Sequence, residues 1–150
     1  MKINKKNITE KAANLISELG YLYIETSFRG TDNNSVIEIF VDSEKGITTV
    51  NCAEISHAIG ELFETEELVR SKFRLDISSP GIDRPLKFLQ QFPKNINRKF
   101  ELRIKENDAI KKTTAKLVSV EGCKLNFDEG KNVFSVDFEN ITSAKVLISF

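Results

Sequence analysis

The sequence predicts an α+β protein built from two small domains. The first is an N-terminal α/β sandwich, in which two helices cover a three-stranded sheet. The second is an all-β SH3-like or Sm-like small barrel. Two observations carry this: residues 1–78 show periodicities in the order helix-strand-strand-helix-strand, and from residue 98 short period-two segments recur between turns. We place the domains at 1–83 and 94–150, joined by a linker with a short helix at 84–93.

The first helix is predicted to begin at Thr9, which can cap it, and to end at Gly20. Its apolar residues recur at helical spacing: Ile8, Ala12, Leu15, Ile16 and Leu19. Two strands follow at 21–28 and 36–42, because both runs are rich in β-branched and aromatic residues. The polar run 29–35 between them predicts a hairpin with a long loop.

A second helix is predicted to be capped by Thr48 or Thr49 and to end in the acidic run 64–69. Its apolar stripe consists of Cys52, Ile55, Ile59 and Leu62 or Phe63. His57 lies off this stripe, so we expect it to face solvent. The third strand, 72–78, places Phe73, Leu75 and Ile77 on one face.

Residues 86–92 predict a short helix that Pro93 ends. The strands predicted after it are 98–105, 113–122, 123–130, 131–138 and 144–150. The turns between them contain Asn107-Asp108, Glu121-Gly122 and Glu129-Gly130. Apolar residues mostly follow period two here, which disfavours a helical alternative.

The residue inventory leaves little room for catalysis or metal binding. His57 is the only histidine, and the two cysteines, Cys52 and Cys123, lie far apart outside any C-x-x-C pair. We read both cysteines as small buried hydrophobes and expect no metal and no cofactor. No apolar run approaches the ~18 residues of a membrane span, and the N-terminus lacks the apolar core of a secretory signal. We therefore expect a cytoplasmic protein that is not an enzyme.

The formal net charge is zero, but the two halves differ. Residues 1–83 carry 9 Lys and Arg against 14 Asp and Glu, whereas residues 84–150 carry 13 against 8. Such a split favours the C-terminal half as the neighbour of phosphate, with ordinary solvated charge as the alternative.

The stretch RLDISSPGIDRPLK, residues 74–87, permits three interpretations. A catalytic serine is disfavoured because the G-x-S-x-G elbow is absent and only carboxylates are near in sequence. An anion site is possible in chemical terms, since serine hydroxyls, amides around Gly81 and Arg84 can all donate to phosphate. Turn chemistry alone also explains every residue type, with Pro80-Gly81 making the turn and Pro85 starting the short helix. We favour the turn, acting as a hinge between the domains.

This stretch resembles the signature of the bacterial ribosome maturation factor family RimP. The residues that match the signature are Ser78, Ser79, Pro80, Gly81, Asp83, Arg84, Pro85 and Leu86. Residues 36–56 and 92–104 are also similar to the family, so the resemblance covers nearly the whole chain. It implies an α/β domain followed by an SH3-like barrel. It also implies a cytoplasmic, non-catalytic factor that binds immature 30S subunits and assists 16S rRNA folding and incorporation of a small-subunit protein near the decoding centre.

In this reading basic side chains of the linker and the barrel contact rRNA phosphates or an acidic protein surface. The candidate contacts are Arg84, Lys87, Lys94, Arg98, Lys99, Arg103, Lys111 and Lys112. The alternative is a protein-protein adaptor whose barrel binds a ribosomal-protein segment by strand addition or in a groove, with little RNA contact. We expect a monomer, although the sequence does not separate it from a weak dimer.

Overall fold

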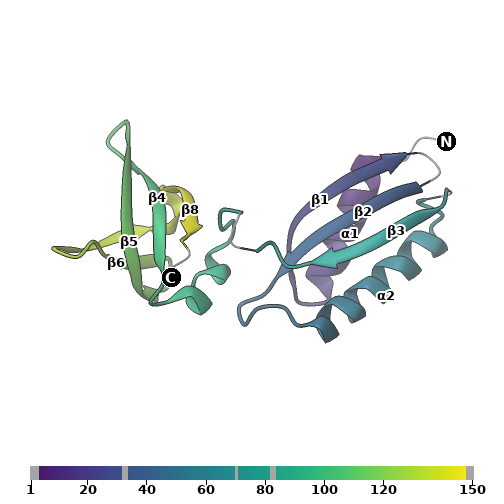
Figure 1. Cartoon of the computed structure of the whole chain (residues 1–150), viewed down its shortest axis with the longest axis horizontal. Coiled ribbons are helices and arrows are strands. Elements are labelled where there is room, and N and C mark those ends of the chain that lie inside the picture. Colours follow the sequence, from purple (N-terminus) through teal and green to yellow (C-terminus); the bar gives the residue numbers. More distant parts are fainter. Residues whose placement is uncertain (1–3, 32–33, 70, 82–83, 148–150) are drawn as a thin grey trace. The chain divides into compact units, whose positions relative to one another are not determined.

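The computed structural model describes residues 4–31, 34–69, 71–81 and 84–147 (Figure 1). The chain divides into two compact units, Met1–Pro80 and Gly81–Phe150. Each unit has a hydrophobic core of its own. The finer boundaries predicted from the sequence, at residues 83 and 93, stay predictions.

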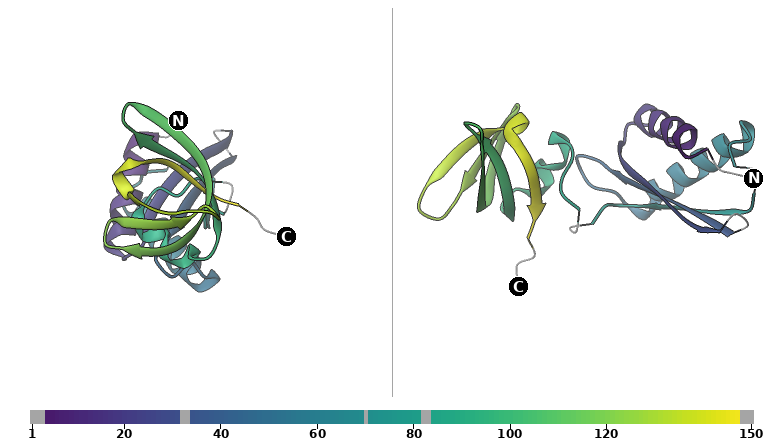
Figure 2. Two further views of the ribbon diagram at one scale, coloured as in Figure 1. Left: turned by 90° about the vertical axis from the view of Figure 1, so that its left-hand side faces the viewer. Right: turned by 90° about the horizontal axis from the view of Figure 1, so that it is seen from above.

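The first unit follows the predicted order helix-strand-strand-helix-strand. Its elements are α1 (Lys5–Glu18), β1 (Leu22–Thr31), β2 (Asn34–Asp42), α2 (Thr49–Thr65) and β3 (Phe73–Ser78). β2 lies in the middle of the sheet, antiparallel to β1 and parallel to β3. Both helices cover the same face of this sheet (Figures 1 and 2). The predicted sandwich is confirmed.

The core of this unit lies between the helices and the sheet. Its members are fully buried: Ile8, Ala12, Ile16, Ile37, Ile39, Val41, Ile55, Ile59 and Phe63. They come from one stripe of each helix and from alternate positions of β2, as amphipathic elements require. Phe73, Leu75 and Ile77 pack against them, as predicted. His57 is exposed, which also agrees with its place off the α2 stripe.

The predicted N-cap is correct for the second helix and wrong for the first. α1 begins at Lys5, and its N-cap is Asn4, whose side chain accepts a hydrogen bond from the Asn7 N–H at 3.0 Å. The predicted cap at Thr9 is wrong, because the apolar stripe marks only the buried part of the helix. α2 is capped by Thr48, which exchanges hydrogen bonds of 3.0 and 3.1 Å with Asn51 in a capping box.

The hairpin between β1 and β2 is tighter than predicted. The strands continue through the polar run until Thr31 pairs with Asn34, so the long loop at 29–35 is wrong. Asp32 and Asn33 lie outside the described residues. Gly30 has a φ of +88°, and a Cβ there would collide with the backbone carbonyl oxygen of Asn34. Only glycine fits this position.

We therefore expect Gly30→Ala to destabilise the first unit by about 2 kcal/mol or more, because strain at positive φ adds to the collision. Gly46→Ala is the matched control. Gly46 has a φ of +92° but no atom within 4 Å of an added Cβ, so the substitution should cost only about 1–2 kcal/mol of strain. Hydrogen exchange of the β1 and β2 amides measures both. Equal losses would contradict the collision.

The second unit is all-β apart from short 3₁₀ turns, as predicted. Its strands are β4 (Lys99–Glu106), β5 (Ala109–Glu121), β6 (Lys124–Asp128), β7 (Val133–Asp137) and β8 (Ile141–Val146). They form one antiparallel sheet in the order β7-β6-β5-β4-β8, and side chains from all five strands share one core. Among the described residues β7 and β8 do not pair, so the SH3-like closure stays a prediction.

The predicted short helix at 86–92 is a single 3₁₀ turn, η1 (Leu89–Gln91), and Pro93 begins a second turn, η2 (Pro93–Asn95). The buried Gln91 side chain organises the segment, because its Oε1 accepts from the Lys87 and Phe88 N–H groups at 2.7 and 2.8 Å. Leu86 donates its N–H to the Ala144 carbonyl at 2.8 Å. Leu86, Leu89 and Phe92 pack into the core of the second unit. The segment that we predicted as a linker is thus part of this core.

The β4–β5 turn lies at Asn107-Asp108, as predicted, with φ values of +46° and +58°.

The two cysteines are more exposed than predicted. Cys52 is half-buried, and Cys123 is exposed beside the Gly122 turn, so the interpretation of both as buried hydrophobes is wrong. Burial raises the pKa of the Cys52 thiol. In the described ranges, no helix combines the length and apolarity that crossing a membrane requires.

Candidate nucleic-acid interface

The outer face of β5-β4-β8 gathers basic side chains. β4 lies between β5 and β8 (Figure 1). Its odd-numbered residues are exposed and its even-numbered residues up to Ile104 are buried, so the odd-numbered ones point away from the core. The strand register places their partners from β5 and β8 on the same face. We call the six exposed basic residues of this surface the cationic face: Lys99, Arg103, Lys105, Lys112, Lys116 and Lys145.

The register sets like charges directly opposite each other. Lys99 pairs with Lys116, and Arg103 pairs with Lys112. Like charges at such positions destabilise a sheet, by up to roughly 1 kcal/mol for each pair. Two repulsive pairs across one pair of strands are therefore unfavourable for folding in isolation. They are favourable for a surface that meets a polyanion.

Few acids offset these charges. Glu101 faces Lys145 and Thr114, and Asp128 of β6 faces Lys116, which leaves the surface with a clear excess of positive charge. Among the described residues, no ion pair within 4.0 Å involves any member of the cationic face. The basic groups remain available to phosphate oxygens, which bind lysine and arginine through charge and hydrogen bonds.

The structure divides the candidate contacts predicted from the sequence. Lys99, Arg103 and Lys112 belong to the cationic face. Lys111 points to the other side of β5, where its Nζ lies 3.4 Å from Glu129 Oε1 and 5.4 Å from the centroid of the Phe134 ring. The remaining four candidates precede β4. Arg84 is half-buried, and the other three are exposed: Lys87, Lys94 and Arg98.

Sequence reasoning missed Lys105, Lys116 and Lys145. The sequence does indicate two of them, because residues an even number of positions apart share one face of a strand. Lys105 follows Arg103 by two positions, and Lys116 follows Lys112 by four. Lys145 becomes part of the surface only through the pairing of β8 with β4, which the sequence does not show.

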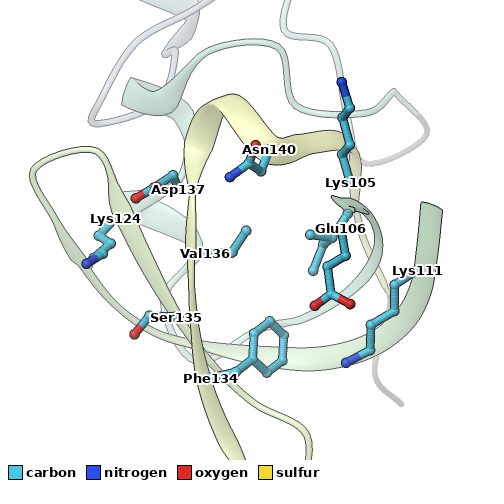
Figure 3. A pocket seen from close by; sticks show the side chains of 10 residues that line it. Lys105, Glu106, Lys111, Lys124, Phe134, Ser135, Val136, Asp137 and Asn140 are labelled. Atoms are coloured by element: carbon cyan, nitrogen blue, oxygen red, sulfur yellow. The ribbon is translucent and has the colours of Figure 1, made fainter. Parts of the chain in front are cut away.

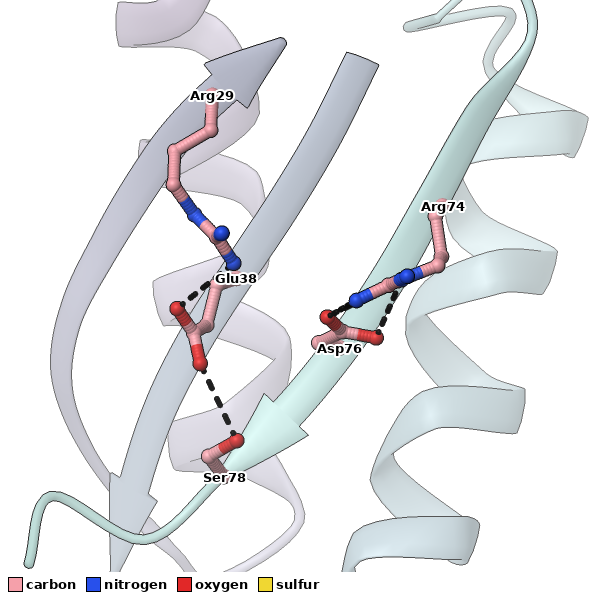
Figure 4. A network of polar contacts seen from close by, with 5 residues as sticks. All are labelled: Arg29, Glu38, Arg74, Asp76 and Ser78. Carbon is pink, nitrogen blue, oxygen red and sulfur yellow. Dashed lines mark hydrogen bonds and ion pairs between the residues drawn. The ribbon is translucent and has the colours of Figure 1, made fainter. Parts of the chain in front are cut away.

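In the described part of the chain, the signature residues form local contacts and a turn. Ser78 ends β3, and its Oγ donates to Glu38 Oε2 at 3.5 Å (Figure 4). That carboxylate is also held by Arg29, at 3.2 Å. Ser79 and Pro85 are exposed, Pro80 is half-buried, and Gly81 has a φ of +68° as expected for a turn glycine. Asp83 lies outside the described residues.

The open face of the first sheet is also charged, but its charges are balanced. Arg74 binds Asp76 through two nitrogens, with distances of 2.8 Å from Nη2 to Oδ2 and 3.2 Å from Nε to Oδ1 (Figure 4). The hydrogen bonds from Arg74 lower the pKa of the Asp76 carboxyl. Glu38 lies directly opposite Asp76 and has Arg29 as its partner. This surface therefore lacks the positive excess of the cationic face.

A metal centre finds no support either. Within the described ranges, no three side chains of His, Cys, Asp or Glu converge in a geometry that could hold an ion.

Comparison with known families assigns the first unit. Residues 11–83 match the family described as the RimP N-terminal domain. The first unit carries the N-terminal domain of the RimP family. The resemblance inferred from the signature is thereby confirmed, and it places the protein among the ribosome maturation factors. The matched residues include the signature up to Asp83, whereas the cationic face lies in the second unit, outside the match.

Proposed function

We propose that this protein binds immature 30S subunits in the cytoplasm and assists both 16S rRNA folding and incorporation of a small-subunit protein, without catalysis. The RimP N-terminal domain in the first unit supports this role at the level of ribosome maturation. The observation that carries the RNA contact is the cationic face, where like charges lie opposite each other.

The mechanism is contact and pre-organisation. The exposed groups of the cationic face bind phosphates of folded rRNA and so favour conformations that present phosphates at the same spacing. The remaining large exposed side chains of β5, Ile110 and Val118, are aliphatic and give no platform for base stacking on this face. Recognition on the face itself is therefore by shape and charge.

The signature turn has a separate role in this proposal. We assign Pro80-Gly81 to the boundary between the two units, where it acts as a hinge. The supporting contacts are local. Ser78 is tied to Glu38 within the first unit, and Leu86 is tied to Ala144 within the second.

Deletion of the gene is expected to lower the ratio of mature 30S subunits to precursor particles in a sucrose gradient. The tagged protein should sediment with the precursors and be absent from 70S ribosomes, because a maturation factor leaves the finished particle. Complementation with the unaltered gene is the control. An unchanged gradient profile in the deletion strain would contradict the proposal.

A second function, the protein-protein adaptor, is favoured by the free side of β7. Among the described residues β7 pairs only with β6, so its other edge can accept an added strand. Pull-down of a small-subunit protein after nuclease treatment tests it. Capture that survives nuclease, with no effect of reversing charges on the cationic face, would favour the adaptor over the RNA contact.

A further inference from the structure

The second unit contains a pocket of about 240 Å³ between the β4–β5 hairpin and the β7–η3 segment, where η3 is Phe138–Asn140 (Figure 3). No function has been assigned to it so far. Its lining residues come from four elements and the end of a fifth: Ile104, Lys105, Glu106, Lys111, Lys124, Phe134, Ser135, Val136, Asp137 and Asn140.

The pocket is apolar at its base and polar at its rim. Ile104 and Val136 are buried members of the core, and the half-buried Phe134 ring lies beside them. At the rim, Glu106 and Lys111 extend toward the Phe134 ring and Asn140 lies at the other end, whereas the side chains of Lys105, Lys124 and Asp137 point outward (Figure 3). A planar ring that carries donors and acceptors on its edge suits such a site.

Phe134 is held firmly enough to act as a stacking surface. Its ring stacks on Phe127, with the centroids 5.6 Å apart and the planes inclined by 24°. The Lys111 ammonium lies over the same ring, 5.4 Å from its centroid. A base that stacks on Phe134 would displace this exposed ammonium, because base stacking on an aromatic ring is stronger than one exposed cation–π contact. The displaced Lys111 can then bind the phosphate of that nucleotide.

The pocket adjoins the cationic face. Lys105 connects the two, since the residue borders the pocket while its side chain lies on the outer face of β4 opposite Ile110. A single RNA strand whose phosphates follow the cationic face thus reaches the pocket without leaving basic residues. This continuity with the cationic face favours an RNA strand as the occupant over an acidic or neutral peptide.

We propose that the pocket binds one unpaired RNA base, taken from the strand whose backbone lies on the cationic face. This inference rests on the proposed RNA contact and deepens it. The base stacks on Phe134, its polar edge meets Asn140, and its phosphate meets Lys111, with Lys105 on the approach from the cationic face. The protein would then prefer RNA with accessible single-stranded nucleotides to fully paired RNA.

The absence of tryptophan from the sequence makes a direct test available. In the full-length Phe134→Trp variant the only indole lies at the pocket. Titration with a single strand of about ten nucleotides should quench its fluorescence through stacking, whereas a fully paired RNA of the same length should not. Val133→Trp is the matched control, because Val133 is the neighbouring residue of β7 and does not line the pocket.

A second measurement separates the pocket from the cationic face. Phe134→Leu should weaken binding of the single strand about tenfold in fluorescence anisotropy and leave the affinity for paired RNA unchanged. Circular dichroism melting checks that this variant folds. If both RNAs bind but the indole responds to neither, the pocket proposal is overturned while the RNA contact stands. If neither RNA binds at low salt, the pocket proposal and the RNA contact both fail. If a peptide of a small-subunit protein quenches the indole and RNA does not, the pocket is a peptide site.

Discussion

The double variant Arg103→Glu, Lys112→Glu is expected to bind 30S precursor particles on the order of tenfold more weakly or worse, because two phosphate contacts become repulsive. The dependence of the affinity on salt should change as well. Each lost phosphate contact lowers the slope of log K against log salt by about one unit, so we expect a decrease of about two. Co-sedimentation at several salt concentrations measures both quantities.

The double variant keeps the fold comparable, since it replaces one like-charge pair by another at directly opposite positions. The matched control reverses two exposed lysines outside the cationic face, Lys45→Glu and Lys131→Glu, which gives the same net charge. This control should retain more affinity than the double variant. Equal losses would mean that binding senses net charge alone and that the cationic face has no special role.

Lys112→Glu alone sharpens the result. It turns the Arg103–Lys112 repulsion into an attraction, which should stabilise the second unit by roughly 0.2–1 kcal/mol. The same change should weaken binding. A variant that is more stable and yet binds less cannot owe its defect to unfolding.

Phe92→Ala should destabilise the second unit by about 3–5 kcal/mol, a large fraction of the roughly 5–15 kcal/mol by which an ordinary domain is stable. Phe92 is fully buried although it precedes the first strand of the unit. Its ring stacks on Phe100 at a centroid distance of 5.7 Å and meets Phe138 edge-on at 5.9 Å. Truncation would leave a cavity among these rings.

Because the chain has two units, the loss should be followed by hydrogen exchange in each unit separately. Amides of β4 to β8 should lose protection, and amides of β1 to β3 should keep theirs. Phe88→Ala is the control, since Phe88 belongs to the same segment but is only half-buried. Comparable losses in the two variants would contradict a special role of Phe92 in the core.

Much of the fold could be predicted because the buried faces leave periodic traces. The α2 stripe, the alternation in β3 and the positive-φ turn at Asn107-Asp108 all appear directly in the sequence. The misses occur where tertiary pairing overrides local chemistry. Gly30 is typical of a loop, yet it lies within β1 because its backbone pairs with β2.

The burial of Phe92 in the core of the second unit was also not predicted, because the segment around it was interpreted as a linker. Proline-rich surroundings indicate an irregular backbone, and the backbone from Leu86 to Asn95 is indeed irregular. Irregular backbone is compatible with full burial when a buried side chain satisfies it, as Gln91 does for the amides of Lys87 and Phe88. No local pattern shows that in advance.

The candidate interface was predictable only as a set of basic residues. Successive side chains of a strand point to opposite faces, so the sequence already indicates that Lys111 and Lys112 lie on different faces of β5. The opposition of Arg103 to Lys112 depends also on the length of the Asn107-Asp108 turn, because that length sets the register, and the predicted strands 98–105 and 113–122 left it open. The pocket likewise joins residues far apart in the chain, from Ile104 to Asn140.

The repulsion between β4 and β5 also bears on how long the protein survives in the cell. A ligand that binds only the folded state stabilises it, and a polyanion on the cationic face would in addition screen the two repulsive pairs. Under the proposed function, a copy that is not bound to a precursor particle opens more often, and proteases act on open chains. The abundance of this factor would then follow the supply of unfinished subunits without any dedicated regulator.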